Sequence, residues 1–361
     1  MTNAAVIGCG RMGTLFDDTN VFIKPATHGG IYYLHPKIKL ISACDINNNR
    51  LKNFGNKYKC KNLYCDYRYM LKKEKIDILS ICTHAQDHSQ MCIDAANYGV
   101  KSIFCEKPIA TNLTECEEMI KACEENNVKL TINHTRRWDI YFDYINNILK
   151  EKVIGDIDAV TAISTAGLLN GGCHMFDMLR NWFGDAEWVE GEIEYDNSTD
   201  PSATGIIKFK DVLVYFNNSF KDYVTFDISI IGKKGKIDTF GMVRSERRFE
   251  LFTPKGSLYD KGTKALSREK VPEDNIKKLI SKKLELNTKQ SPMMNALDDI
   301  INSLENNVET KCNGYDGKSS LEIALAFHES SRNKKRVYLP LQNKYLRVIP
   351  RMTSFTKDGK F

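Results

Sequence analysis

Three glycines follow the first apolar segment of this 361-residue chain and leave few folds open to it. The segment Ala4–Ile7 is brief and apolar, and Gly8-Cys9-Gly10-Arg11-Met12-Gly13 comes directly after it. A first glycine permits a tight turn, a second lets the backbone approach a ligand, and a third allows a helix to pack closely on the strand. The chain is therefore expected to open with a strand, a glycine turn and a helix.

The first third of the chain repeats this alternation of strand and helix. Its predicted strands are Ala4–Ile7, Lys39–Cys44, Ile76–Cys82, Ser102–Cys105 and Lys129–Ile132. Short runs of Ile, Val and Leu are typical of parallel strands covered on both faces. The clearest helical pattern begins at Asn112, a good N-cap, with Glu115 three residues later. The alternation predicts an α/β fold with a doubly wound parallel sheet over residues 1–133.

The glycine turn and one acidic residue together predict a dinucleotide cofactor. Asp45 ends the second predicted strand, where a carboxylate binds the adenosine ribose and repels a 2′-phosphate, so NAD is favoured over NADP. Asp45 lies further along the chain than usual, which indicates an insertion within Asp17–Pro36. The alternative is a structural turn in a fold that binds no cofactor. The turn residues expected to contact the cofactor are Gly8, Gly10, Arg11, Met12 and Gly13.

The pattern changes from about Ile157. One helical run, His174–Phe183, precedes strand-like segments with no helices between them, and two C-terminal helices are expected near Met293–Leu304 and Ser320–Ser331. We therefore predict a second, α+β domain over residues 134–340 with a largely antiparallel open sheet, and a tail over 341–361. Its predicted strands are Trp188–Tyr195, Gly205–Phe209, Leu213–Asn217, Thr225–Ile231 and Arg248–Phe252, with a hairpin turn at Gly232–Gly235.

Two segments carry residue types suited to proton chemistry. Glu106-Lys107-Pro108 ends a predicted strand, so Lys107 would point into the crevice where a nicotinamide lies, and proline restricts its backbone. A lysine there can stabilise a developing alkoxide. His174 and Asp177 lie three apart near the start of a helix, and the helix N-terminus would keep His174 neutral. Read alone, the first segment is only a turn and the histidine a buried core residue.

Taken together, these motifs resemble the glucose–fructose oxidoreductase/inositol dehydrogenase/MocA (Gfo/Idh/MocA) family over nearly the whole chain. Glu-Lys-Pro after such a strand is the most specific mark of the family. The resemblance also rests on the glycine turn, Asp45, Thr83, His88, the run Asn133-His134-Thr135-Arg136-Arg137-Trp138, the segment Asn170–Asp177 and the stretch Ile230–Ile237.

The resemblance implies hydride transfer between a nicotinamide and a hydroxyl or keto carbon of a sugar, a cyclitol or a nucleotide-linked sugar. It implies that Lys107 and His174 act at the reacting oxygen, with Asn170 beside them, and that the open sheet forms a homodimer or homotetramer. By the same resemblance, Thr83, His88, Glu106 and Lys107 join the cofactor site, and Lys107, His134, Arg136, Arg137, Asn170, His174 and Asp177 line the substrate pocket. Arg136 and Arg137 could equally form interdomain ion pairs.

This sequence departs from the family pattern in two ways. Many members have aspartate four residues before the histidine, where this chain has Asn170, and an amide cannot accept a proton. The span from Gly155 to His174 is also short, so a loop that often lines the pocket is reduced. Two alternatives stay open: a redox-neutral epimerase or lyase with recycled NAD, and a non-catalytic NAD-dependent sensor.

Composition limits the kinds of partner, metal site and cellular location that the chain can have. The net charge of +6 is diffuse, which suits an anionic small molecule and does not indicate nucleic acid, and the lysines at 277–278 and 282–283 are interpreted as a solvated helix face. The eleven cysteines include no Cys-x-x-Cys pair, so they predict core residues in a reducing compartment and no metal site. No apolar run is long enough for a membrane helix. The cytoplasm is the expected location.

Overall fold

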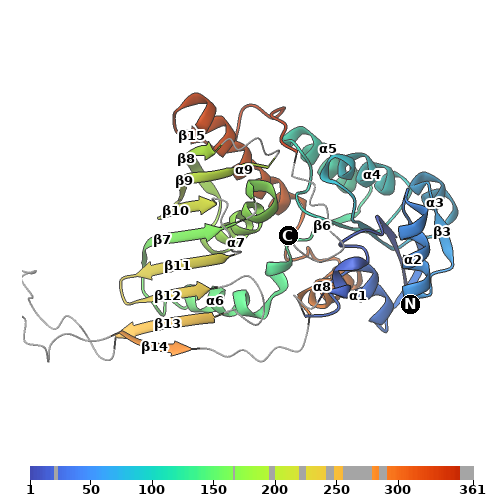
Figure 1. Ribbon diagram of the computed structural model, residues 1–361, viewed down its shortest axis with the longest axis horizontal. Coiled ribbons are helices and arrows are strands. Elements are labelled where there is room, and N and C mark those ends of the chain that lie inside the picture. The colour runs from blue at the N-terminus through green and yellow to red at the C-terminus, as the bar shows by residue number, and fades with distance from the viewer. Residues whose placement is uncertain are drawn as a thin grey trace, which may run out of the picture.

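The chain builds two sheets that lie side by side, each covered by helices (Figure 1). The computed structural model describes residues 1–19, 23–165, 167–194, 200–218, 225–240, 248–254, 279–283 and 291–349. The first sheet is formed by β1 (Thr2–Ile7), β2 (Ile38–Cys44), β3 (Asn62–Tyr64), β4 (Ile78–Ile81), β5 (Ser102–Cys105) and β6 (Lys129–Ile132).

All neighbours in this first sheet are parallel, in the order β3-β2-β1-β4-β5-β6. The predicted doubly wound sheet is confirmed, and its order reverses between β1 and β4, which places a crevice at the carboxyl ends of those strands. The Asn112 side chain accepts a hydrogen bond from the Glu115 amide, as expected of a cap. The connecting helices are α1 (His28–Leu34), α2 (Asn48–Tyr58), α3 (Tyr67–Lys73), α4 (Ala85–Asn97) and α5 (Leu113–Glu125).

The helix that follows the glycine turn is interrupted by an insertion. In an uninterrupted helix the carbonyls of Met12 and Gly13 accept from residues 16 and 17. Here they accept from the amides of His28 and Gly29, at 3.0 Å each, which is a shift of twelve residues. The insertion therefore ends before His28, where α1 begins, inside the predicted range Asp17–Pro36. It starts with the short 3-10 helix η1 (Leu15–Asp18), two residues before that range.

The second sheet has nine strands and is antiparallel except between β7 and β10. Its order is β14-β13-β12-β11-β7-β10-β9-β8-β15. The strands are β7 (Ile157–Ser164), β8 (Ala186–Glu194), β9 (Ser202–Phe209), β10 (Val212–Asn218), β11 (Phe226–Gly232), β12 (Gly235–Phe240), β13 (Arg248–Pro254), β14 (Leu279–Lys283) and β15 (Val337–Tyr338). The predicted largely antiparallel sheet is confirmed. The interpretation of Lys282-Lys283 as a helix face is wrong, because both residues belong to β14, and Lys277-Lys278 lie outside the described residues.

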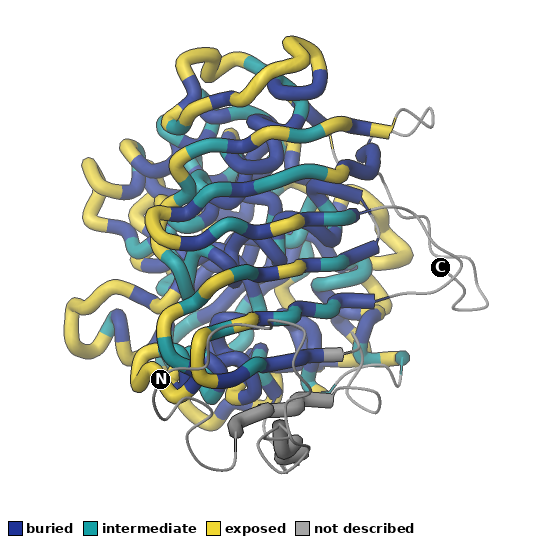
Figure 2. Tube along the Cα trace, turned by 90° about the vertical axis from the view of Figure 1, so that its left-hand side faces the viewer, coloured by how far each residue is buried: buried dark blue, intermediate teal, exposed yellow. Residues whose placement is uncertain are grey.

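Helices cover one face of this sheet, and no described helix covers the other, which is called the open face below (Figure 2). Along β7, Val160 and Ala162 are fully buried while Thr161 between them is exposed, the alternation expected of a sheet covered on one side. The helical segments of this half are η2 (Thr135–Trp138), α6 (Ile140–Lys150), the π-helical turn η3 (Gly167–Gly172), α7 (Cys173–Phe183), α8 (Pro292–Asn306) and α9 (Gly314–Asn333).

The last part of the chain returns to the first sheet. Helix α8 contacts α1, and His35 bonds Asp298 across that contact at 3.0 Å. Further on, the amide of Val348 donates to the carbonyl of Thr111, just before α5, at 3.0 Å. The described part of the predicted tail is thus docked on the first domain.

Candidate active site

The glycine turn lies in the crevice at the end of β1. Gly8 has a φ of +91°, and a Cβ there would lie 2.7 Å from the carbonyl carbon of Cys82, so only glycine fits. A Cβ on Gly13 would lie 2.1 Å from the carbonyl oxygen of Gly8. At Gly10 the nearest atom would be a guanidinium nitrogen of Arg50 at 3.7 Å, so the backbone there is open to a ligand. The turn therefore has the shape that a bound pyrophosphate requires.

Asp45 follows β2 directly and holds this turn. Its Oδ2 accepts from the amide of Cys9 at 2.7 Å, and its Oδ1 accepts from the amide of Asn47 at 2.7 Å. Each carboxylate oxygen has a second lone pair, so these bonds orient the group without exhausting it. Asp45 thus lies at the carboxyl end of β2, beside the glycine turn.

Three further predicted cofactor residues lie around the same crevice. The Arg11 guanidinium lies 5.0 Å from the centre of the Phe16 ring, and burial lowers its pKa although Glu106 acts in the opposite direction. His88 is buried, with Nε2 3.2 Å from the carbonyl oxygen of Thr83 and Nδ1 3.1 Å from that of Pro108. Because both ring nitrogens face backbone carbonyls, His88 joins the loops after β4 and β5.

Lys107 follows β5 and reaches across to the turn before α7. Its Nζ donates to both the backbone carbonyl and the side-chain Oδ1 of Asn170, at 3.0 Å each. The structure therefore brings together two of the three predicted catalytic residues. Because both acceptors belong to Asn170, these two hydrogen bonds set the direction of the Lys107 amino group.

His174 lies one helical turn beyond Asn170. Burial lowers its pKa well below the usual 6.5, and the charges of Arg136 and Lys107 lower it further, so the imidazole is neutral at pH 7. The predicted cause is wrong, because helical backbone already begins at Gly167 and His174 does not lie at a helix N-terminus. Within the described part of the chain, its buried Nδ1 has no hydrogen-bond partner.

His134 lies beside His174, with their ring centres 5.6 Å apart and nearly perpendicular. Its Nε2 lies 3.1 Å from the Ser320 hydroxyl, and burial lowers the pKa of His134 to about 4. Two neutral imidazoles therefore adjoin Lys107. Arg136 is buried nearby, with its guanidinium 3.9 Å from the centre of the Phe226 ring.

Arg137 and Asp177 have a different environment from the other predicted pocket residues. They form a two-point ion pair, Nε to Oδ2 and Nη2 to Oδ1 at 2.8 Å each, with Asp177 fully buried. Arg137 also contacts Asp316 at 3.3 Å. Arg137 therefore forms ion pairs, but its partners Asp177 and Asp316 belong to the same predicted domain 134–340, so these pairs are not the interdomain ones expected.

Glu106 belongs to a buried hydrogen-bond network with His28, Asn133 and Ser80. Glu106 Oε1 lies 3.0 Å from His28 Nε2 and accepts from the Asn133 amide at 2.7 Å, while His28 Nδ1 lies 2.7 Å from the Ser80 hydroxyl. Burial alone would raise the pKa of Glu106, but His28 and Lys107 outweigh it and the pKa is lowered. Sequence reasoning gave His28 little weight, because a single histidine inside an insertion carries no pattern.

Asp200 is a second buried carboxylate that sequence reasoning missed. It precedes β9, and its oxygens accept from the amides of Leu169 and Asn170. No motif surrounds it in the sequence, so only the fold reveals that it lies against the turn before α7.

Among the described residues, no helix is both long and apolar enough to span a membrane. No group of three or more His, Cys, Asp or Glu side chains there is arranged to hold a metal ion. All eleven cysteines are free, and nine of them are buried.

Two family models match this chain. One, described as the oxidoreductase family, NAD-binding Rossmann fold, of the GFO/IDH/MocA group, matches residues 2–134. The other, described as the C-terminal alpha/beta domain of the same oxidoreductase family, matches residues 162–339. Together they span most of both sheets.

Individual relatives agree with the family models. An uncharacterised oxidoreductase of Bacillus subtilis, YrbE, is 26% identical over 90% of this chain and 93% of its own. Myo-inositol 2-dehydrogenase of Thermotoga maritima is 24% identical over 64% of this chain and 73% of its own. The solved structure of the WlbA dehydrogenase of Bordetella pertussis, in complex with NADH and UDP-GlcNAcA, has a TM-score of 0.72 at 20% identity and covers 94% of this chain and 99% of its own. That likeness shows the fold.

Proposed function

This chain belongs to the Gfo/Idh/MocA oxidoreductase family and carries its NAD-binding Rossmann domain, and from that premise we propose that it is an NAD-dependent dehydrogenase or reductase of a sugar-like substrate. The reaction moves a hydride between the nicotinamide and a carbon that bears a hydroxyl or keto group. The observation that carries the proposal is the contact of Lys107 with Asn170 beside the crevice of the first sheet, with a neutral His174 close enough for the charge of Lys107 to lower its pKa.

Each of these residues has a role that follows from its chemistry. In oxidation, the hydroxyl proton passes to neutral His174 while Lys107 donates a hydrogen bond to the developing alkoxide. In reduction, the same proton returns from His174 to the carbonyl oxygen. The amide of Asn170 cannot take a proton, so its role is to orient Lys107 and the substrate.

NAD supplies the hydride acceptor when it is bound, and the first sheet has residues that would hold it. The open backbone at Gly10 suits the pyrophosphate, and Asp45 suits a free ribose hydroxyl better than a 2′-phosphate. Repulsion between the Asp45 carboxylate and a 2′-phosphate supports NAD in preference to NADP.

The proposed substrate class is a sugar, a cyclitol or a nucleotide-linked sugar. The relative that is 24% identical is named myo-inositol 2-dehydrogenase. The solved structure that is 20% identical is a dehydrogenase in complex with UDP-GlcNAcA. A cationic environment at Lys107 and Arg136 also suits a substrate with a carboxylate or phosphate.

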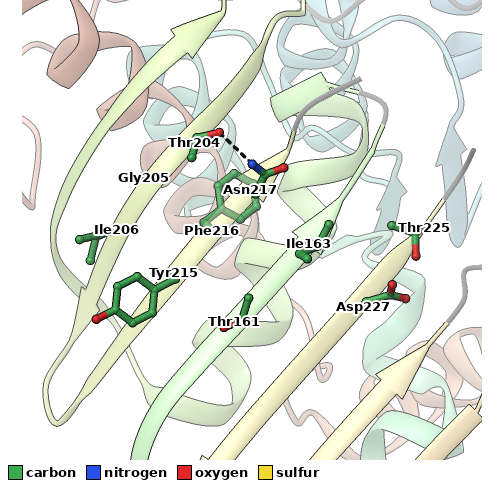
Figure 3. Close-up of a pocket in the computed structure, with 10 residues that line it drawn as sticks. All are labelled: Thr161, Ile163, Thr204, Gly205, Ile206, Tyr215, Phe216, Asn217, Thr225 and Asp227. Carbon is green, nitrogen blue, oxygen red and sulfur yellow. Dashed lines mark hydrogen bonds between the residues drawn. The ribbon is translucent and has the colours of Figure 1, made fainter. Parts of the chain in front are cut away.

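We also propose that the open face of the second sheet pairs with another copy of the chain. A shallow hollow on that face is lined by side chains from four neighbouring strands, and Figure 3 shows Ile163, Ile206 and Tyr215 among them. Tyr215 is 50% exposed, and Ile231 on the same sheet is 43% exposed. Light scattering should give the mass of a dimer or tetramer, and Tyr215→Glu should lower it; a monomeric wild-type protein would contradict the proposal.

Nicotinamide absorbance tests the reaction directly. Pure protein is incubated with free sugars, cyclitols, sugar phosphates and nucleotide sugars, each with NAD and with NADP. Reduction of NAD by one class establishes a dehydrogenase and names its chemistry. If no class changes the absorbance while cofactor is shown to bind, the dehydrogenase proposal fails, and product analysis by NMR then separates a redox-neutral enzyme from a sensor.

A further inference from the structure

Asp200 is held in one orientation by the backbone of the turn before α7. It is 1% exposed, its Oδ1 accepts from the Leu169 amide at 2.7 Å, and its Oδ2 accepts from the Asn170 amide at 2.9 Å. Two adjacent amides therefore point at one carboxylate. Hydrogen bonds to an ionised acceptor are stronger than neutral ones, so this contact fixes the backbone of Asn170 firmly.

Gly167 provides the room for this contact. Its φ is +77°, and a Cβ at that position would lie 2.4 Å from Asp200 Oδ2. Any other residue there would push the carboxylate out of the turn. The glycine and the aspartate therefore form one unit, although 33 positions separate them in the chain.

The opposite side of Asn170 holds Lys107. Its carbonyl oxygen and its Oδ1 both accept from Lys107 Nζ at 3.0 Å. A continuous path thus runs from the Asp200 carboxylate, through the backbone of Asn170, to the amino group of Lys107. Because Asn170 aims that amino group, a change in the orientation of Asn170 moves the group that contacts the reacting oxygen.

We propose that Asp200 is a positioning residue that sets Lys107 at the reacting oxygen through Asn170, and so supplies, from the segment before β9, the carboxylate that the Asn170–His174 segment lacks. This inference rests on the proposed dehydrogenase function for the role of Lys107. In this scheme Asp200 acts on the position of Lys107 through the hydrogen bonds of Asn170, beside the electrostatic effect between the two charges.

The charge of Asp200 changes within an accessible range of pH. Burial raises its pKa to about 6, against the lowering effect of its backbone hydrogen bonds and of Lys107. Lys107, at the end of β5, and Cys173, in α7, face Asp200 electrostatically, and burial raises the pKa of Cys173 to about 11, so that thiol stays neutral. Protonation of Asp200 removes an acceptor from one amide and weakens its hold on Asn170.

The test compares Asp200→Asn with Asp299→Asn. Asn has the size of Asp, but its amide nitrogen cannot accept from Leu169 or Asn170. We expect kcat to fall about 10- to 100-fold, as for a loss of one aligned donor, with KM for NAD within about twofold. Asp299 also accepts from two N–H donors, Lys311 and Trp138, both through Oδ2, so Asp299→Asn controls for the loss of a hydrogen-bonded negative charge and should leave kcat within about twofold.

The pH profile separates positioning from simple structural damage. Wild-type kcat should decline as the pH falls through about 6, and Asp200→Asn should lack that decline. Asn170→Ala should weaken the same decline without abolishing it, because it removes Oδ1 and leaves the backbone carbonyl as the acceptor for Lys107. Wild-type kcat in Asp200→Asn, or an unchanged decline near pH 6, would overturn the proposal.

A substrate-free measurement keeps this test apart from the test of function. The rate at which an amine reagent labels Lys107 is followed by peptide mass spectrometry from pH 5 to 9 in the wild type alone. We expect a step in reactivity centred near pH 6. A smooth profile overturns the positioning role even if turnover is found, whereas a step without turnover on any substrate retains it and counts only against the dehydrogenase.

Discussion

Helix α7 presents two titratable residues to two very different surroundings within a single turn. Asp177 faces Arg137, which also contacts Asp316, and Asp316 in turn contacts Arg180 at 3.1 Å. The four charged groups alternate in sign, and the pKa of Arg137 is raised above its usual value by Asp177 despite burial. The charges that act on His174, only three residues away, are those of Arg136 and Lys107, and they lower its pKa.

The difference separates charges that hold the fold from charges that remain for chemistry. The Asp177 cluster compensates its own charges, so a ligand has little to gain there. Around His174 the positive groups act on neutral imidazoles, and an alkoxide or other anion would be stabilised. Variants of the residues around Asp177 and around His174 test this difference.

The largest effect is expected from Lys107→Met. Losing the donor to the developing alkoxide should lower kcat by about 10³- to 10⁴-fold, while NAD binding and thermal stability stay near the wild-type values. Stopped-flow absorbance measures kcat, and titration of bound NADH fluorescence measures cofactor binding. Normal turnover would show that Lys107 does not act at the reacting oxygen.

Arg137→Met should act on stability instead. Removing one partner of a buried ion pair leaves Asp177 uncompensated, which costs about 3–5 kcal/mol of unfolding free energy. Urea unfolding followed by circular dichroism measures that loss, and the surface pair Lys334–Glu192 supplies a control, since Lys334→Met should change stability by less than about 1 kcal/mol. A stable Arg137→Met protein with impaired substrate affinity would instead place Arg137 in the pocket.

His174→Asn should reduce kcat by about 100-fold, because the proton acceptor is lost. The variant should also be less sensitive to acid. A histidine whose folded pKa lies below 6.5 destabilises the protein as the pH falls through 6.5, since the unfolded chain takes up the proton first. His328, in α9, has a pKa lowered to about 4 by burial alone, so His328→Asn should flatten the same stability curve without changing turnover. Loss of turnover in both variants would mean that the effect is structural.

Asp45→Ser is expected to have the smallest effect of the four. Removing the carboxylate should relax the preference for NAD over NADP by about tenfold, or about 1.4 kcal/mol. The ratio of kcat/KM for the two cofactors measures it. Because Asp45 also accepts from the Cys9 amide, weaker binding of both cofactors without a change in their ratio would assign it to the turn alone.

The sequence predicted best where a pattern is local. Five of the six parallel strands follow from apolar runs, and the positions of Asp45 and Lys107 follow from the ends of two of them, whereas β3, only three residues long, was not predicted. Strand β7 was missed, because its polar residues on the open face interrupt the apolar run. The partners of Arg137 and Asp177 depend on how η2 meets α7, and no spacing in the chain encodes that contact.

Asp200 and His28 show the limit more sharply. Each is one titratable residue in a segment without periodicity, and each becomes informative only when a distant element is packed against it. Asp200 meets the turn before α7 because η3 packs against β9, and His28 meets Glu106 through α1. Long-range packing of single residues is what local propensity cannot express.

The insertion after the glycine turn preserves the hydrogen-bond register of the helix that it interrupts, because the carbonyls of Met12 and Gly13 find donors in His28 and Gly29. The helix therefore continues at His28 with the hydrogen bonds that it would have made without the insertion. A segment of another length placed here would have to keep His28, which supports Glu106, and would replace the contacts of Asp18 with Lys57 and of Pro25 with Ser291. The insertion between Gly13 and His28 therefore adds residues at the rim of the crevice while the helix on either side of it keeps its register.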